Sequence, residues 1–251
     1  MFGIESANVV GYNTITIDKQ YNLIGVNFQS VDGKALSIQD AIVPSDKMTQ
    51  GNAITVADQI QIQNATGGYV MYYLSNGTAG KASYPATKGK WVLATAPSTP
   101  TTDTIPTGTG FWFITKDAPA EPFTISVAGS VLMSTSEAKD LTTQYSIVAN
   151  PYPVDIPLNG GVVAENGTQG NAITVADQIQ IQNSTGGYTM YYLSNGTAGK
   201  ASYPATKGKW VLATAPSTAT TDKVPAGAGV WFIRKSDSTT KLTFNNPTVS
   251  E

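Results

Sequence analysis

Hydrophobic and polar side chains alternate over short stretches of this chain, which is the pattern of β-strands with one buried face. In residues 60–63 two isoleucines face one side of the expected strand and two glutamines face the other. Residues 64–68 contain a glycine turn signal, and residues 69–74 are expected to return as the second strand of a hairpin. Residues 36–42 are expected to form a single helical turn. Further strands are predicted at residues 13–17, 21–28, 91–95 and 111–114.

The chain contains a long internal repeat. Residues 50–116 recur as residues 169–235, and 58 of these 67 aligned positions are identical. Residues 21–28 are more weakly similar to residues 145–152. The identity extends over every kind of position, so a recent duplication explains it as well as a shared functional surface does.

Short strands separated by Gly and Pro turns indicate a sandwich or a barrel. We therefore predict an all-β protein of two tandem β-sandwich (or partly open barrel) domains of about 120 residues each. The domains are expected at residues 1–126, called repeat 1 below, and at residues 127–251, called repeat 2.

Composition narrows the functional classes mainly by exclusion. The chain has no cysteine and no histidine, which removes disulfides, thiolate or imidazole metal sites and cysteine or histidine catalysis. Charged residues make up 13% of the chain, about half of the roughly 25% usual in globular domains. The net charge is −2 and the 15 basic residues are spread out, so no nucleic-acid partner is expected.

The expected location is extracellular or on the cell surface. Residues 1–5 do not read as a signal peptide, and no run of 18 apolar residues predicts a transmembrane segment. The polar, Thr-rich, weakly charged composition is typical of bacterial extracellular proteins, so we hypothesise that a leader has been removed and Met1 added. A natural cytoplasmic start is the alternative.

Two short motifs carry a resemblance to a known kind of module. In repeat 2, residues 145–153 read Tyr-Ser-Ile-Val-Ala-Asn-Pro-Tyr-Pro, and residues 225–233 read Pro-Ala-Gly-Ala-Gly-Val-Trp-Phe-Ile. The chain thereby resembles a β-module of secreted and cell-surface bacterial proteins. That module opens with aromatic-Asn-Leu-Val-Gly-Asn-Pro-Tyr-Pro and closes with Pro-Gly-x-Gly-Phe-aromatic-Val.

Repeat 1 departs from the opening motif, with Val-Asn-Phe-Gln at residues 26–29, and matches the closing one better, with Gly-Phe-Trp-Phe at residues 110–113. The resemblance implies an accessory or structural role outside the cell, and it carries no catalytic residues over.

Acidic residues are the main remaining candidates for catalysis or metal binding. Asp58 and Asp103 in repeat 1 recur as Asp177 and Asp222, and two acids per domain could meet as a glycosidase pair. No local motif supports this, and turn capping is the simpler reading. Calcium stays open as a ligand, but no Asp-x-Asp-x-Asp-Gly loop supports it, so we expect no cofactor and no metal site.

Aromatic residues supply the candidates for ligand binding. Neighbours in a strand point to opposite faces, so at least one of Tyr72 and Tyr73 is expected to be exposed, where its ring could stack on a sugar. The alternative is that tyrosine is simply a preferred strand residue. Trp112 and Trp231 are expected in the core. The ten candidates are Tyr69, Tyr72, Tyr73, Tyr84, Trp91, Tyr188, Tyr191, Tyr192, Tyr203 and Trp210.

These observations favour an extracellular structural or surface protein without enzymatic activity. It would self-associate as a homo-oligomer or join other cell-surface proteins, since a weakly charged surface reduces repulsion between copies. Residues 8–17 could be donated to a neighbour as a strand, although pairing within the repeat is the default. The alternative is a carbohydrate-binding module with a polysaccharide as partner. A hydrolase is the third candidate.

Overall fold

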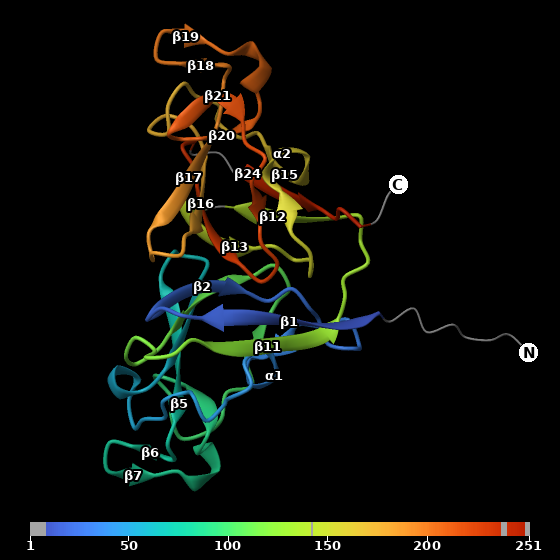
Figure 1. Ribbon diagram of the computed structural model, residues 1–251. Helices are drawn as coiled ribbons and strands as arrows, with labels where there is room; N and C mark the ends of the chain where they lie inside the picture. The colour runs from blue at the N-terminus through green and yellow to red at the C-terminus, as the bar shows by residue number, and fades with distance from the viewer. Residues whose placement is uncertain (1–8, 142, 237–239, 249–251) are drawn as a thin grey trace, which may run out of the picture.

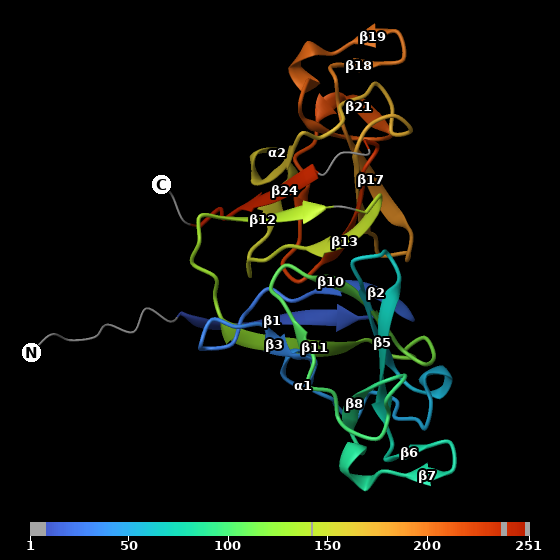
Figure 2. The ribbon, with the colours of Figure 1, turned by 180° about the vertical axis from the view of Figure 1, so that it is seen from behind.

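The computed structural model describes residues 9–141, 143–236 and 240–248. The protein is all-β, as the alternation of side chains predicts (Figure 1 and Figure 2). The two repeats occupy opposite halves of the molecule, and no sheet within the described residues combines strands from both. Helices are limited to single turns, and no described helix has the length and apolarity needed to cross a membrane.

A five-stranded antiparallel sheet in repeat 1 contains the predicted hairpin. Its strand order is β2-β10-β4-β5-β8. The β4–β5 turn is closed by a hydrogen bond from Asn64 N–H to Gly68 O, and Gly67 supplies the positive φ that the turn requires. The strands are β2 (Tyr21–Gly25), β4 (Gln59–Gln63), β5 (Tyr69–Ser75), β8 (Lys90–Leu93) and β10 (Gly110–Ile114).

A smaller sheet, β1 (Val10–Ile17) with β11 (Phe123–Ser130), covers the core side of this sheet. The default expectation that residues 8–17 pair within their own repeat is therefore confirmed for residues 10–17, whereas residue 8 lies outside the described residues. Because β11 continues past residue 126, repeat 1 extends in the structure to Ser130, and the first strand of repeat 2 begins at Ser136. The expected helical turn is α1 (Ile38–Ala41), which Ser37 caps by accepting the N–H of Asp40. Shorter elements are β3 (Leu36–Ser37), β6 (Thr78–Ala79), β7 (Ala82–Ser83), β9 (Thr104–Ile105), η1 (Ile54–Val56) and η2 (Pro85–Thr87).

Repeat 2 repeats this plan with additional strands. Its large sheet has the order β13-β23-β16-β17-β20-β21, and its small sheet has the order β12-β24-β15. The large sheet consists of β13 (Tyr145–Ala149), β16 (Gln178–Gln182), β17 (Tyr188–Leu193), β20 (Trp210–Leu212), β21 (Ala215–Ala219) and β23 (Gly229–Ile233). The remaining elements are β12 (Ser136–Leu141), β14 (Ile156–Pro157), α2 (Leu158–Gly161), β15 (Val162–Glu165), β18 (Thr197–Ala198), β19 (Ala201–Ser202), η3 (Pro204–Thr206), β22 (Lys223–Val224) and β24 (Thr240–Asn245).

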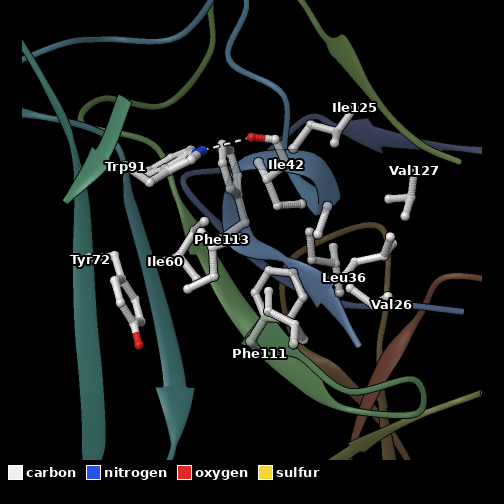
Figure 3. Packing of buried hydrophobic residues seen from close by; sticks show 14 of the residues in the cluster. Val26, Leu36, Ile42, Ile60, Tyr72, Trp91, Phe111, Phe113, Ile125 and Val127 are labelled. Carbon is white, nitrogen blue, oxygen red and sulfur yellow. Dashed lines mark hydrogen bonds between the residues drawn. The ribbon is translucent and has the colours of Figure 1, made fainter. Parts of the chain in front are cut away.

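Each repeat buries its own apolar core between its large and small sheets. In repeat 1, Phe113 from the large sheet and Ile125 from the small sheet belong to one cluster (Figure 3). Trp91 is fully buried there, and its Nε1 donates to Ile42 O over 2.7 Å, which satisfies the indole N–H. In repeat 2, Trp210 occupies the same place. This two-layer packing is the arrangement of a β-sandwich.

The expectation that Trp112 and Trp231 lie in the core is wrong. Both are half-buried. Strand register places Trp112 opposite Gln61, on the sheet face that points away from the core, whereas Phe113 lies opposite the buried Ile60. An uninterrupted aromatic run such as Phe-Trp-Phe places the middle ring on the opposite face, whatever its hydrophobicity.

Two strands of repeat 2 have no counterpart in repeat 1, β21 in the large sheet and β15 in the small sheet. β15 pairs with β24, and Glu165 lies opposite Lys241. In repeat 1 the place of Lys241 is taken by Pro122, which has no N–H to donate to a neighbouring strand. Pro44 likewise replaces Ala164 in the segment that follows the helical turn. The small sheet of repeat 1 therefore stops at two strands.

Candidate functional site

Most of the aromatic side chains suggested for ligand binding lie inside the protein. Tyr72 and Tyr73 point to opposite faces of β5, yet both are buried, so the expectation that one of them is exposed is wrong. Tyr72 enters the main core, while Tyr73 packs with Ala57 and Val92 in a second small cluster that also includes Ile54. The other buried members of the set are Trp91, Tyr191, Tyr192 and Trp210.

The most exposed aromatic rings are ones that the sequence pattern did not single out. Tyr12 is 75% exposed, Tyr21 53% and Tyr145 51%. Tyr21 also meets the half-buried Trp112 edge to face, with 6.4 Å between ring centroids. These tyrosines stand at the first residue of a strand or on an edge strand, and this position was the feature of the sequence that could have indicated their exposure. The four remaining candidates, Tyr69, Tyr84, Tyr188 and Tyr203, are half-buried.

The two repeated acids of repeat 1 hold different parts of the fold. Asp58 is buried, and its Oδ2 and Oδ1 accept the backbone N–H groups of Thr49 (3.0 Å) and Lys116 (2.8 Å). Burial raises the pKa of this carboxyl. Asp103 is exposed, and its Oδ2 accepts from the Tyr72 hydroxyl over 2.8 Å. Within the part of the chain that the structure describes, the two carboxylates share no hydrogen-bond partner.

Repeat 2 keeps both arrangements. Asp177 accepts from the N–H groups of Thr168 and Lys235, and Asp222 accepts from the Tyr191 hydroxyl over 2.8 Å. Burial raises the pKa of both Asp177 and Tyr191. All four acids therefore serve as acceptors that tie loops and strands together, and Asp58 and Asp177 do so as buried carboxylates.

Several cavities indent the surface. One of about 330 Å³ lies beside Asp58, and one of about 360 Å³ lies beside Trp210. A third, of about 270 Å³, lies where the repeats meet and is lined by Gly108, Lys139 and Pro151. Within the described residues, no group of three or more acidic side chains is placed to hold a metal ion.

The two repeats join through a pair of glutamines that act in the same way. Gln63, at the end of β4, donates its Nε2 to Tyr145 O (3.0 Å) and accepts the N–H of Ile147 at its Oε1 (2.9 Å). Its side chain thus makes with the backbone of β13 the two hydrogen bonds that a neighbouring strand would make. Gln182, its counterpart, bonds in the same way to Tyr21 O (2.9 Å) and Leu23 N (3.0 Å).

Backbone contacts at the joint are paired in the same way. Gly25 N–H donates to Gly227 O, and Ala149 N–H donates to Gly108 O, each over 2.9 Å. The approach is so close that a Cβ on Gly110 would lie 2.4 Å from Val148 O, and a Cβ on Gly229 would lie 2.7 Å from Ile24 O. The Pro-x-Gly-x-Gly motif of each repeat therefore serves close approach of the other repeat. The motif is visible in the sequence at residues 106–110 and 225–229, but its use depends on tertiary packing.

Comparison of the chain with family models, with curated proteins and with solved structures finds no match.

Proposed function

We propose that this protein is an extracellular, non-enzymatic structural or surface protein that associates with further copies of itself. The observation that carries the proposal is the free edge of β1. Val9 O accepts from Val131 N–H on the β11 side. Because backbone groups alternate along a strand, the groups of Val10, Tyr12, Thr14 and Thr16 point away from β11. The described residues supply no hydrogen-bond partner along that edge.

The composition of this edge favours pairing with another strand. Residues 10–17 carry no charge and no proline, and the side chains of Val10 and Tyr12 are 66% and 75% exposed. Natural proteins usually protect such edges with charges, prolines or bulges. Two copies of β1 could pair antiparallel with Tyr12 opposite Thr14 of the second copy, an aromatic and β-branched pair of the kind that stabilises sheets.

The matching strand in repeat 2 supplies the contrast. β12 is shorter than β1, and it carries Glu137, Lys139 and Asp140. Charges on an edge strand oppose its pairing with a like strand. The proposed association therefore uses repeat 1 rather than repeat 2.

The experiment is light scattering with negative-stain microscopy over a range of protein concentrations, with and without calcium. We expect dimers or larger ordered assemblies that grow with concentration. Thr14→Lys should reduce them, whereas the matched control Ala138→Lys on β12 should leave them unchanged. A wild-type protein that stays monomeric throughout would contradict the proposal. Equal effects of the two lysines would contradict the role of β1.

Carbohydrate binding is the second candidate, and the exposed rings of Tyr21 and Tyr145 favour it. Each lies on the outer face of a large sheet, where a ring can stack on a sugar face. The test is retention of the protein on polysaccharide columns. Tyr21→Ala combined with Tyr145→Ala should abolish retention, while Tyr12→Ala on the small sheet should not. Absence of retention in the wild type would contradict this candidate.

A further inference from the structure

The joint between the repeats has the form of a two-fold symmetric dimer interface within one chain. Every contact named above occurs twice, with the roles of the repeats exchanged. Gln63 hydrogen-bonds to the backbone of β13, and Gln182 hydrogen-bonds in the same way to the backbone of β2. The N–H of Gly25 donates to Gly227 O, and the N–H of Ala149 donates to Gly108 O. In such an isologous interface the same surface is present on both partners, so it fits a second copy of itself.

Because the two halves of the joint are equivalent, each contact between two copies of repeat 1 has a counterpart in the structure. The Gln63 side chain would meet Tyr21 O and Leu23 N of the second copy, which are the groups that Gln182 already binds. Gly25 N–H would meet Gly108 O, which already accepts from Ala149 N–H. Each of these contacts is therefore one that the structure already contains.

Two copies of repeat 2 meet an obstacle at a single position. Gly25 and Ala149 are equivalent residues, and they face each other where the repeats meet. A Cβ on Gly25 would lie 2.0 Å from the Cβ of Ala149, far inside the contact distance of two carbon atoms. Because a β-carbon cannot rotate away, a pair of alanines here would force the backbones apart. A pair of glycines would not.

We propose that this joint is an exchangeable assembly surface with a defined pairing rule. Repeat 1 accepts either repeat of a second copy, whereas repeat 2 accepts only repeat 1. The proposal rests on the proposed self-association only in taking a second copy as the partner. The five residues 131–135 connect the repeats. When repeat 1 of one copy pairs with repeat 2 of the next, copies join head to tail, either as an exchanged dimer or as an open chain.

The pairing rule can be tested on the full chain after the folded protein has been cut between its two repeats. A protease site is inserted after Met133, which is 53% exposed between the two repeats, and the folded protein is cut without denaturation. Cut protein labelled with ¹⁵N is mixed with unlabelled cut protein, and native mass spectrometry counts the species. We expect labelled repeats to exchange, and complexes of repeat 1 with repeat 1 to appear beside complexes of repeat 1 with repeat 2. Complexes of repeat 2 with repeat 2 should be absent.

Two substitutions sharpen the test. Ala149→Gly removes the obstacle, so complexes of repeat 2 with repeat 2 should appear at a level comparable to those of repeat 1. Gly25→Ala introduces it, so the mixed complex should weaken at least tenfold. Failure of the repeats to exchange, or formation of the repeat 2 pair without Ala149→Gly, would overturn the proposal.

These outcomes are separable from those of the proposed function. If the cut repeats disobey the rule while the intact chain still assembles, the pairing rule fails and self-association stands. If the rule holds while the intact chain stays monomeric at every concentration, the joint is self-complementary and the proposed self-association fails.

Discussion

Repeat 1 and repeat 2 are almost the same sequence over residues 50–116 and 169–235, yet their sheets end differently. The large sheet has five strands in repeat 1 and six in repeat 2, and the small sheet has two strands and three. The shared interior is unchanged: Trp91 and Trp210 are buried and donate to equivalent carbonyl groups. The differences lie at sheet edges.

Prolines account for these edges. Repeat 1 has Pro100 where repeat 2 has Ala219, and Pro122 where repeat 2 has Lys241. In repeat 2 both positions belong to strand pairs, Ala219 with Val211 and Lys241 with Glu165. Pro122 lacks the N–H that Lys241 directs at β15, and Pro100 fixes φ at about −65° at a position that belongs to a strand in repeat 2, so a few substitutions decide the number of strands around a conserved core. Near-identity of two sequences therefore does not make their edges alike.

The largest expected effect tests whether the shared interior is equally important in both repeats. Trp91→Ala and Trp210→Ala each leave a large cavity and an unpaired carbonyl, so each should lower the free energy of unfolding by about 3–5 kcal/mol. Urea unfolding monitored by circular dichroism measures this. Losses below about 1.5 kcal/mol would indicate that the sheets collapse around the cavity. Trp112→Ala, at a half-buried position, is the matched control with a smaller loss.

The buried acids should give the next largest effect. Asp58→Ala or Asp177→Ala leaves two part-buried backbone N–H groups without their acceptors, which should cost about 2–4 kcal/mol in the free energy of unfolding. Urea unfolding at neutral pH measures both variants. The control is Asp103→Ala, which removes an exposed carboxylate and should cost about 1 kcal/mol. A cost for Asp58→Ala no greater than for Asp103→Ala would show that water replaces the carboxylate.

The pH dependence of these acids should differ between the repeats. Burial raises the pKa of Asp58 and Asp177 above 3.8, and Asp117 raises that of Asp58 further, whereas Arg234 opposes the rise at Asp177. A raised pKa in the folded state contributes stability that is present below pH 3.8 and lost as the pH rises through the folded value. Asparagine cannot titrate, so the cost of Asp58→Asn should shrink as the pH rises through this window.

The corresponding change for Asp177→Asn should be smaller, because the charge of Arg234 favours the ionised carboxylate. Urea midpoints measured between pH 3 and pH 7 compare the two variants with the wild type. Equal pH profiles would show that the side chain of Arg234 does not act on Asp177.

Much of the fold follows from alternation, but the surfaces do not. The β4–β5 hairpin and the helical turn α1 lie where sequence analysis predicts them. Alternation predicts that one of Tyr72 and Tyr73 is exposed, because it assumes that one sheet face meets solvent. In the structure Ile54 and Ala57, from the segment that precedes β4, cover the second face. It also assigns Gln63 to solvent, although this side chain serves a strand of the other repeat. Such contacts depend on tertiary packing, which local patterns do not report.

Lys241→Pro should make repeat 2 resemble repeat 1 at its small sheet. It removes the N–H opposite Glu165, so we expect a loss of about 1 kcal/mol and faster amide exchange in β15. Hydrogen exchange followed by NMR measures the protection of Val163 and Thr243. Unchanged protection of these two amides would show that β15 is held by its own packing rather than by this pairing.

Pro100→Ala is the smallest change and the most direct test of how prolines decide the edges. It removes the ring that fixes φ of residue 100 at about −65°, so this residue can adopt the more extended φ that a strand requires, as the equivalent Ala219 pairs within β21 in repeat 2. It also frees the unfolded chain, which costs about 0.4–1 kcal/mol. A new hydrogen bond from Leu93 N–H to Thr99 O is worth about 0.5–1.5 kcal/mol, so the free energy of unfolding should change little, while the amide of Leu93 becomes protected from exchange as a sixth strand forms. Because residues 94–99 are identical to residues 213–218, an unprotected amide here would place the cause of the sixth strand outside this segment.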